Sequence, residues 1–370
     1  MGQISVLVVD DSVVVRRLVT TALEEDPAIR VIGTASNGRL ALAKIDQLAP
    51  DIVTLDVEMP ELDGVATLRA LRVDHPRLPV IMFSTVTERG ARATLDALTA
   101  GATDYVTKPA NMGSVAASLA AVREQLVPRI KALCPRDHAA VPTYPRGVPA
   151  AGAGLASART APRARAGLAL ATRRPEILAI GASTGGPEAL TTLLGALPAD
   201  LPVPVVVVQH MPAVFTRLFA ERLNRSCAIE VGEAGDGQPL RPGVVYLAPG
   251  DHHLEVVGGP AGRRTRLTDA PPENYCRPAV DVLFRSVAKA CGAAALGLVL
   301  TGMGADGRRG AEQLREEGAA ILVQDAATSV VWGMPGAVAA AGLADAVLPL
   351  GEIAAAVLSR VRPSAVGVTR

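Results

Sequence analysis

The sequence predicts an α/β protein with two doubly wound parallel-sheet domains connected by a flexible linker. Three observations lead to this fold class. Short apolar segments alternate with helical patterns early in the chain, the alternation stops over a stretch rich in Ala, Pro, Gly and Arg, and it then resumes. The apolar segments are nearly continuous, which is typical of parallel strands covered by helices on both faces. We place the first domain at 1–125, the linker at 126–174 and the second domain at 175–370.

The first domain contains five apolar segments that we interpret as strands. They are rich in Val and Ile, and helical patterns such as the one through Leu18 and Leu23 separate them. The expected strands are 4–10, 31–36, 51–57, 79–85 and 102–109. Regular alternation of this kind predicts βα units and a parallel sheet with helices on both of its faces.

The linker and the second domain differ sharply in composition. The linker lacks periodic large apolar residues, so it cannot bury enough surface to fold by itself. It is locally basic through Arg159, Arg163, Arg165, Arg173 and Arg174, a charge that we attribute to solvation. Beyond it, strands are expected at 176–183, 204–211, 244–250, 297–302 and 319–325.

Composition excludes several classes of function. Lys and Arg number 37 and Asp and Glu 36, so the net charge of +1 provides no basic field for nucleic acid. Aromatic residues make up only 2% of the chain, too few for a base-stacking platform. Segment 326–344 is uncharged, but its apolar residues are mostly Ala, so we expect buried turns and helix and no membrane insertion.

The cysteines and the N-terminus favour a cytoplasmic location. Asp10 and Asp11 fall where a secretion signal would need apolar residues. The cysteines show no CxxC spacing, which argues against a zinc site or a disulfide framework. Buried free thiols in a reducing compartment are the better interpretation of Cys134, Cys227, Cys276 and Cys291.

Charged and polar residues lie at the ends of four expected strands in the first domain. Asp10 and Asp11 end the first strand, Asp56 the third, Ser84 the fourth and Lys108 the fifth. The carboxyl ends of parallel strands meet at one edge of a doubly wound sheet, where ligands bind. Three carboxylates there need a hard divalent cation such as Mg²⁺, which with Lys108 would neutralise a phosphoryl group transferred to one of them.

This domain resembles the response-regulator receivers, which have a flavodoxin-like fold, through VVDDS, LDVEMPELDG, FST and YVTKP. The resemblance implies that Asp56 accepts the phosphoryl group from a chemotaxis histidine kinase. It also implies a magnesium site formed by Asp10, Asp11, Asp56 and the main-chain carbonyl of Glu58. Ser84 and Lys108 would contact the phosphoryl group and Tyr105 would be the aromatic switch residue. The Lys108–Pro109 bond is a candidate cis peptide.

The second domain contains a GxSxG sequence, GASTGG at 181–186, between an expected strand and a helix. Glycines on both sides of Ser183 permit the tight turn that would expose its hydroxyl. His210 and Asp306 follow two other expected strands, so the three side chains should meet at one edge of the sheet as a catalytic triad. Taken singly, His210 could be a strand-end histidine and Asp306 a turn residue. The chain order Ser, His, Asp differs from that of ordinary α/β-hydrolases.

From about residue 176 onward the chain resembles the CheB family of chemotaxis protein-glutamate methylesterases. The shared segments are IGASTGGPEAL, VVQHMP, LAPGDHHLEV, RPAVDVLFRSVA and LTGMGADGRRGAE. The resemblance implies a Rossmann-like serine hydrolase domain in which Ser183, His210 and Asp306 are nucleophile, base and orienting acid. Thr184 would help to position the histidine, and the Met303 N–H would be an oxyanion donor. The family varies near His252 and His253, so neither receives a role. A metal pair is not expected there, since neighbours in a strand point to opposite faces.

The resemblance implies an enzyme that demethylates glutamate methyl esters on methyl-accepting chemoreceptors, releases methanol and deamidates receptor glutamines. The hydrolase domain would need no cofactor. The unphosphorylated receiver would pack over the active site, and phosphorylation would favour an open form. Two alternatives remain: a catalytically silent, phosphorylation-controlled adaptor that binds receptors, and an esterase or amidase acting on another protein.

Overall fold

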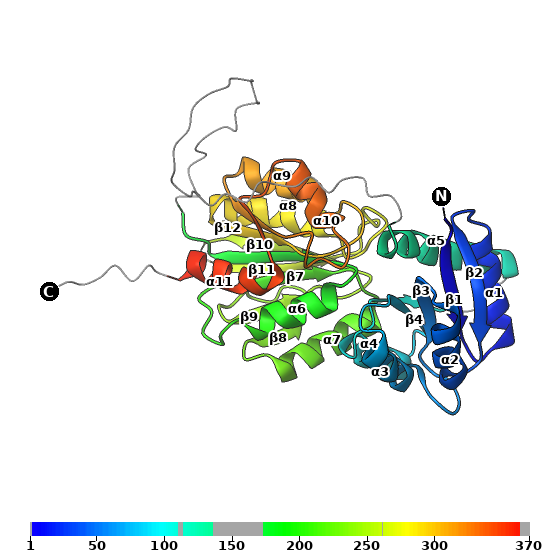
Figure 1. Cartoon of the computed structure of the whole chain (residues 1–370). Coiled ribbons are helices and arrows are strands. Elements are labelled where there is room, and N and C mark those ends of the chain that lie inside the picture. Colours follow the sequence, from blue (N-terminus) through cyan, green and yellow to red (C-terminus); the bar gives the residue numbers. More distant parts are fainter. Residues whose placement is uncertain (1, 110–113, 136–172, 261, 363–370) are drawn as a thin grey trace, which may run out of the picture.

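The chain forms two α/β domains in a computed structural model that describes residues 2–109, 114–135, 173–260 and 262–362. The first domain is drawn in blue and cyan and the second in green to red (Figure 1). Both are built around parallel sheets with helices on either face, which confirms the predicted fold class.

The first domain has a five-stranded parallel sheet in the order β2-β1-β3-β4-β5, as expected for a doubly wound fold. Its strands are β1 (Ile4–Val9), β2 (Ile29–Ala35), β3 (Ile52–Asp56), β4 (Val80–Ser84) and β5 (Asp104–Thr107). Its helices are α1 (Val13–Glu24), α2 (Gly38–Leu48), α3 (Gly64–Asp74), α4 (Glu88–Thr99) and α5 (Val115–Leu133).

Each of these helices begins at a polar capping residue. The capping side chain accepts a hydrogen bond from the backbone N–H three residues further on and so satisfies a donor that the helix leaves free. The caps of α1 to α5 are Ser12, Asn37, Asp63, Thr87 and Ser114. Local sequence therefore fixes where each helix starts, after the strand that precedes it.

The first domain extends beyond its predicted boundary at residue 125. Helix α5 continues to Leu133 although it contains Pro128, which favours a helix end. Leu126 and Ile130 are fully buried against the sheet, and this burial outweighs the effect of the proline. Residues 126–133 therefore belong to the receiver-like domain. Residues 136–172 of the predicted linker lie outside the described residues.

The second domain has a seven-stranded parallel sheet in the order β14-β13-β12-β6-β7-β9-β8. Its strands are β6 (Ile177–Ala182), β7 (Val205–Gln209), β8 (Glu230–Glu233), β9 (Val244–Leu247), β12 (Ala295–Val299), β13 (Ala320–Gln324) and β14 (Ala346–Leu348). An antiparallel hairpin of β10 (His253–Gly259) and β11 (Gly262–Thr268) stands beside it. The predicted strands correspond to β6, β7, β9, β12 and β13. The short edge strands β8 and β14 and the hairpin were not predicted from the sequence.

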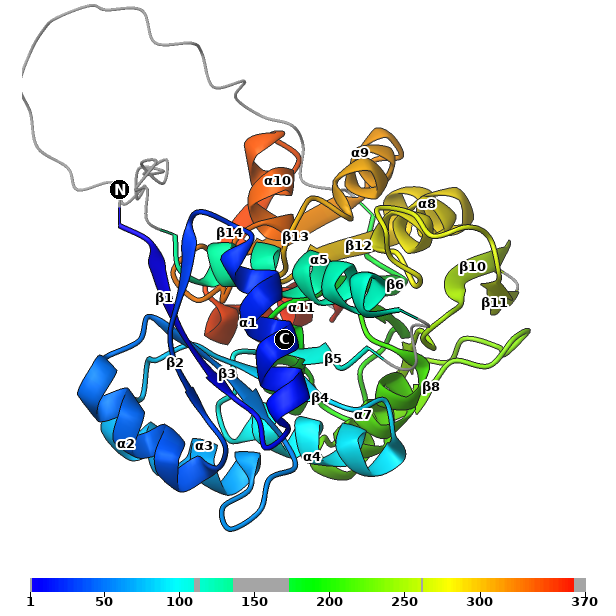
Figure 2. The same ribbon diagram turned by 90° about the vertical axis from the view of Figure 1, so that its right-hand side faces the viewer.

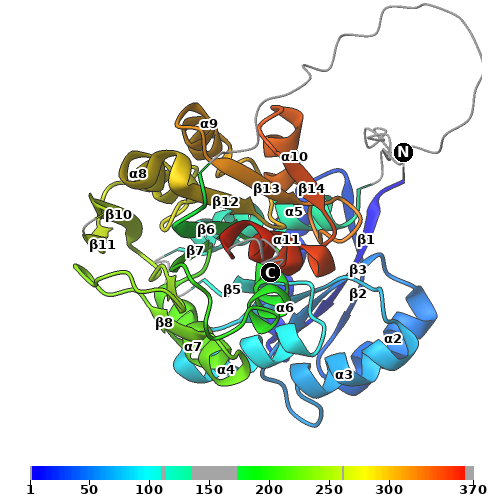
Figure 3. The same cartoon turned by 90° about the vertical axis from the view of Figure 1, so that its left-hand side faces the viewer.

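Helices cover both faces of the larger sheet. They are α6 (Gly186–Gly195), α7 (Ala213–Ser226), α8 (Val280–Cys291), α9 (Arg308–Glu316), α10 (Met334–Ala340) and α11 (Leu350–Val361), with the short 3₁₀ helix η1 (Gly292–Ala294) after α8. Helices α6, α7 and α11 pack on one face, and α8, α9 and α10 pack on the other (Figure 3). The hydrophobic cluster on the α6–α7 face continues into the first domain.

The uncharged segment 326–344 forms turns and helix α10, as predicted. Within the part of the chain that the structure describes, no helix has both the length and the apolar character needed to cross a bilayer.

Candidate active site and phosphorylation site

The acidic residues predicted at the strand ends of the first domain do lie together. Carboxylate oxygens of Asp10, Asp11 and Asp56 are all within 4.8 Å of one another. The Lys108 Nζ lies 2.8 Å from Asp10 Oδ2 and 2.8 Å from Asp56 Oδ2. A cluster of hard oxygen donors beside one ammonium group fits Mg²⁺.

Asp56 is buried, and its environment disfavours the ionised form of its carboxyl group. Burial raises the pKa of Asp56 to about 6, against the hydrogen bond from Lys108, which lowers it, while the nearby Asp10 charge adds to the rise. A divalent cation would relieve this repulsion.

The other predicted receiver residues lie near this cluster with different partners. The Ser84 hydroxyl donates to the Gly90 carbonyl at 3.2 Å, so it points toward the start of α4. The Glu58 N–H donates to Asp56 Oδ1 at 3.4 Å, and its carboxylate pairs with Arg89 at 3.0 Å. The Lys108–Pro109 bond is trans, contrary to our expectation; within the described residues the cis bond is Arg277–Pro278.

In the second domain, three adjacent strands position the predicted triad. Strands β12, β6 and β7 are neighbours in the sheet, and Asp306, Ser183 and His210 follow them. Gly185 has a φ of 75°, a left-handed conformation that glycine adopts easily, and it caps α6 directly after the serine. At Gly186, a Cβ would lie 2.0 Å from the Gln209 side chain, so only glycine fits this close approach.

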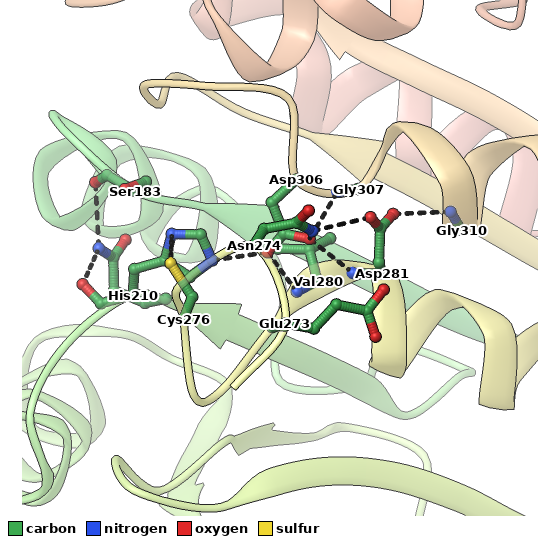
Figure 4. Close-up of polar contacts among 12 residues, drawn as sticks. Ser183, His210, Glu273, Asn274, Cys276, Val280, Asp281, Asp306, Gly307 and Gly310 are labelled. Carbon is green, nitrogen blue, oxygen red and sulfur yellow. Dashed lines mark hydrogen bonds and ion pairs between the residues drawn. The ribbon is translucent and has the colours of Figure 1, made fainter. Parts of the chain in front are cut away.

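His210 is held between two side chains (Figure 4). Its Nε2 donates to Asp306 Oδ2 at 2.8 Å, and its Nδ1 lies 3.5 Å from the Cys276 Sγ. Burial disfavours the charged imidazole, but the hydrogen bonds with Asp306 and Cys276 outweigh burial and raise the pKa of His210 to about 10. Among the hydrogen bonds of the described residues, none joins the Ser183 hydroxyl to His210.

Asp306 is anchored by the N-terminus of helix α8. It accepts hydrogen bonds from the Val280 N–H at 2.7 Å, the Asp281 N–H at 3.0 Å and the Asn274 amide at 2.8 Å. Burial by itself would raise the pKa of Asp306, but these donors and His210 lower it overall. Asp306 is therefore a fixed anion at the positive end of a helix dipole, suited to orient an imidazole.

Several residues of this site were not predicted from sequence patterns. Gln209 Nε2 donates to the main-chain carbonyls of Ser183 at 3.0 Å and His210 at 3.2 Å, and so ties two of the predicted catalytic residues together. Asn274 bridges Asp306 and Asp281, and Cys276 contacts His210. Only weak signals for these residues are present in the sequence. Gln209 directly precedes His210, and residues 273–276 directly precede the segment RPAVDVLFRSVA that the chain shares with the family.

Thr184 and Met303 are the two remaining residues with a predicted role in hydrolysis. The Thr184 hydroxyl donates to Asp104 Oδ2 of the first domain at 3.0 Å, and not to His210. The Met303 N–H makes no hydrogen bond with another described residue, and its oxyanion role stays a prediction. His253 is fully buried, and its two ring nitrogens hydrogen-bond with the backbone of Pro271 and Ala279, which accounts for this histidine structurally.

The first domain lies directly against this site. A cavity of about 260 Å³ is lined by Ser183, His210 and Cys276 together with Asp104, Tyr105 and Arg129 of the first domain. Tyr105 stacks on Phe215 of α7, with 4.8 Å between ring centroids. Figure 2 looks onto the first domain, with the second behind it.

Asp104 is the centre of the polar contacts between the domains. Its Oδ2 accepts hydrogen bonds from both Thr184 and Arg129, and its burial raises the pKa of its carboxyl group. At the periphery, α4 and α7 are joined by an ion pair of 2.6 Å between Asp96 and Arg222. The contact is therefore apolar and hydrogen-bonded near the cavity and ionic at its edge.

Comparisons with known proteins cover the whole chain. The family profile "CheB methylesterase" matches residues 178–357 and "Response regulator receiver domain" matches residues 6–120. A protein of Nocardioides sp. named "Protein-glutamate methylesterase/protein-glutamine glutaminase" is 59% identical over 99% of this chain and 98% of its own. A protein of the same name from Trichodesmium erythraeum is 50% identical over 98% of this chain and 100% of its own.

A solved structure is also similar to part of this chain. The crystal structure of the Thermotoga maritima CheB methylesterase catalytic domain is 39% identical, with a TM-score of 0.49, and covers 50% of this chain and 98% of that one. With full-length relatives at this level of identity, the chain belongs to the CheB family of protein-glutamate methylesterases/protein-glutamine glutaminases, with an N-terminal response-regulator receiver domain.

Proposed function

We propose that this protein is a phosphorylation-controlled enzyme that hydrolyses glutamate methyl esters on methyl-accepting chemoreceptors and deamidates receptor glutamines in the cytoplasm. The single observation that carries the hydrolase assignment is the imidazole of His210, fixed by the buried Asp306 and lining the same cavity as the half-buried Ser183. The names of the full-length relatives support this substrate and reaction.

In the proposed reaction, the Ser183 hydroxyl attacks the ester carbonyl. Because His210 Nε2 donates to Asp306, Nδ1 is the nitrogen that accepts the serine proton. It does so in the molecules whose imidazole is neutral, which are a minority at neutral pH because the pKa of His210 is raised. The oxyanion is stabilised by backbone N–H groups, including that of Met303. His210 then returns the proton to the leaving methanol, and water hydrolyses the glutamyl ester by the same steps in reverse. With glutamine as substrate, the leaving group is ammonia.

We propose that Asp56 accepts a phosphoryl group from a chemotaxis histidine kinase. Asp10, Asp11, Asp56 and the Glu58 carbonyl would hold Mg²⁺, which supplies charge neutralisation to the transferring oxygens. Lys108 already contacts Asp56 and would pair with the bound phosphoryl group. Ser84 would turn from the Gly90 carbonyl toward that group.

The receiver would then control access to the hydrolase site. Tyr105 is next to Asp104 in the chain, and these two residues contact Phe215 and Thr184 of the catalytic domain. A shift of β5 after phosphorylation would weaken both contacts together. In this proposal, the receiver packed against the catalytic domain keeps a receptor helix from reaching Ser183. Because phosphorylation would weaken this packing, it would raise the population of an open form.

We expect Asp56→Asn to retain basal esterase activity and to lose activation by a small phosphodonor with Mg²⁺. The side chain keeps its size but loses the nucleophilic carboxylate. Methanol release from methylated receptors, with and without donor, measures the effect. Asp46→Asn, an exposed change on α2, is the matched control and should still be activated. An Asp56→Asn protein that the donor activates as strongly as the wild type would exclude Asp56 as the acceptor.

A fluorophosphonate probe distinguishes the enzyme from a catalytically silent adaptor. We expect covalent labelling at Ser183, together with release of methanol from radiolabelled receptors. Receptor binding without either signal would support the adaptor. Labelling without methanol release would indicate an esterase or amidase with another protein substrate.

A further inference from the structure

A cysteine thiol, that of Cys276, lies beside the proposed triad. Its Sγ lies 3.5 Å from His210 Nδ1, while His210 Nε2 is bonded to Asp306 at 2.8 Å. A thiol, an imidazole and a carboxylate in hydrogen-bonding sequence are the arrangement that activates a cysteine. The hydrolysis proposed above uses His210 and Asp306 but does not use this thiol.

The loop that carries Cys276 is held in place by several contacts. Cys276 and Glu273 exchange two backbone hydrogen bonds of 2.9 and 3.0 Å, and Asn274 is tied to Asp306. Asn274 and Tyr275 have φ values of 53° and 62°, unusual for residues other than glycine. These hydrogen bonds hold the loop in the conformation that places the Cys276 sulfur beside the imidazole.

The other cysteines have different surroundings. Burial raises the pKa of the Cys291 thiol to about 11, and burial also raises the pKa of Cys227. Cys134 donates to the Asp51 carbonyl at 3.6 Å. Within the described residues, Cys276 is the cysteine whose sulfur contacts an imidazole and lines the cavity in front of Ser183.

We propose that Cys276 is a reversible modification site at which a low-molecular-weight disulfide switches the hydrolase off. The Cys276 proton passes to His210 Nδ1, and the thiolate attacks one sulfur of the disulfide. The S–S bond of the disulfide breaks as the new S–S bond forms, and the departing thiolate takes a proton from the imidazolium or solvent. Each modified protein carries one mixed disulfide and releases one thiol.

Loss of activity follows from the position of the added group, and this part rests on the proposed hydrolase function. A substituent on Cys276 enters the cavity of about 260 Å³ that Ser183 and His210 also line. It would occupy the approach to the serine and lie against Nδ1, the nitrogen that must accept the serine proton. A reducing thiol would restore the original site.

The full-length protein is treated with oxidised glutathione and analysed by peptide mass spectrometry and by methanol release. We expect a glutathione adduct at Cys276 that forms at least about tenfold faster than at any other cysteine, a parallel loss of at least about tenfold in activity, and recovery with dithiothreitol. His210→Gln should slow adduct formation, whereas Ser183→Ala should not. The Cys276→Ser and Cys276→Ala variants should each release methanol at the same rate before and after treatment with oxidised glutathione. Cys227→Ala should be modified and inactivated as the wild type is.

Preferential modification of another cysteine, or an unchanged adduct rate in His210→Gln, would overturn the reactive site. An adduct at Cys276 that leaves methanol release unchanged would overturn the switch. Absence of methanol release from the untreated protein contradicts the proposed function instead, and mass spectrometry still decides whether Cys276 is the reactive thiol.

Discussion

Ser183→Ala is expected to lower ester hydrolysis by about 10⁴-fold or more, a loss of the size seen when a serine nucleophile is removed from a triad. The serine hydroxyl forms the covalent intermediate, and no other group in the proposed mechanism replaces it. The fold should be unaffected, since the substitution removes one oxygen that has no hydrogen-bond partner among the described residues. Methanol release measures activity, and thermal unfolding measures stability.

Ser359→Ala, an exposed change on α11, is the matched control and should leave both measurements within error. His210→Ala and Asp306→Ala should also be severe, and the triple variant little worse than Ser183→Ala because the three residues act as a unit. Losses that multiply across the variants would show that they act independently. Retention of most activity by Ser183→Ala would remove the serine from the mechanism and direct attention to Cys276.

Removal of the receiver is expected to raise activity by about tenfold over the unphosphorylated full-length protein. A fragment of residues 173–370 contains the complete seven-stranded sheet and all the residues proposed for hydrolysis. If the receiver closes the site in most molecules, a tenfold gain corresponds to about 1.4 kcal/mol in favour of closure. The fragment should also be indifferent to phosphodonor, because it lacks Asp56.

A full-length variant tests the same contact without truncation. Arg222→Glu replaces the ion pair with Asp96, between α7 and α4, by a repulsion between two carboxylates, and it should raise basal activity. The increase should be smaller than that caused by removal of the receiver, since exposed ion pairs contribute little to stability. Arg225→Glu changes the same charge further along α7 and serves as its matched control. A fragment that is equal to or slower than the full-length protein, at matched concentration on one receptor, would refute the blocking arrangement and leave the esterase proposal intact.

The sequence by itself determined the two-domain α/β architecture and the edges of the sheets where function should lie. The carboxyl ends of parallel strands lie at a common edge of the sheet. Because Asp10, Asp56 and Lys108 each follow an apolar segment, the sequence predicts that they lie close together in the first domain. The same reasoning predicts that Ser183 and His210 lie close together in the second domain. These inferences succeed because strand periodicity and strand ends are local properties of the chain.

Only the tertiary structure decided how those residues are supported. Asn274 reaches Asp306 from a distant loop, Cys276 contacts His210, and Asp104 of the receiver holds the Thr184 hydroxyl. The extension of α5 past Pro128 likewise depends on burial against the sheet. Such partners depend on loop conformation and on how two domains pack. Hydrogen bonds between remote segments leave no periodic signal in the sequence, because any of many polar residues could have made them.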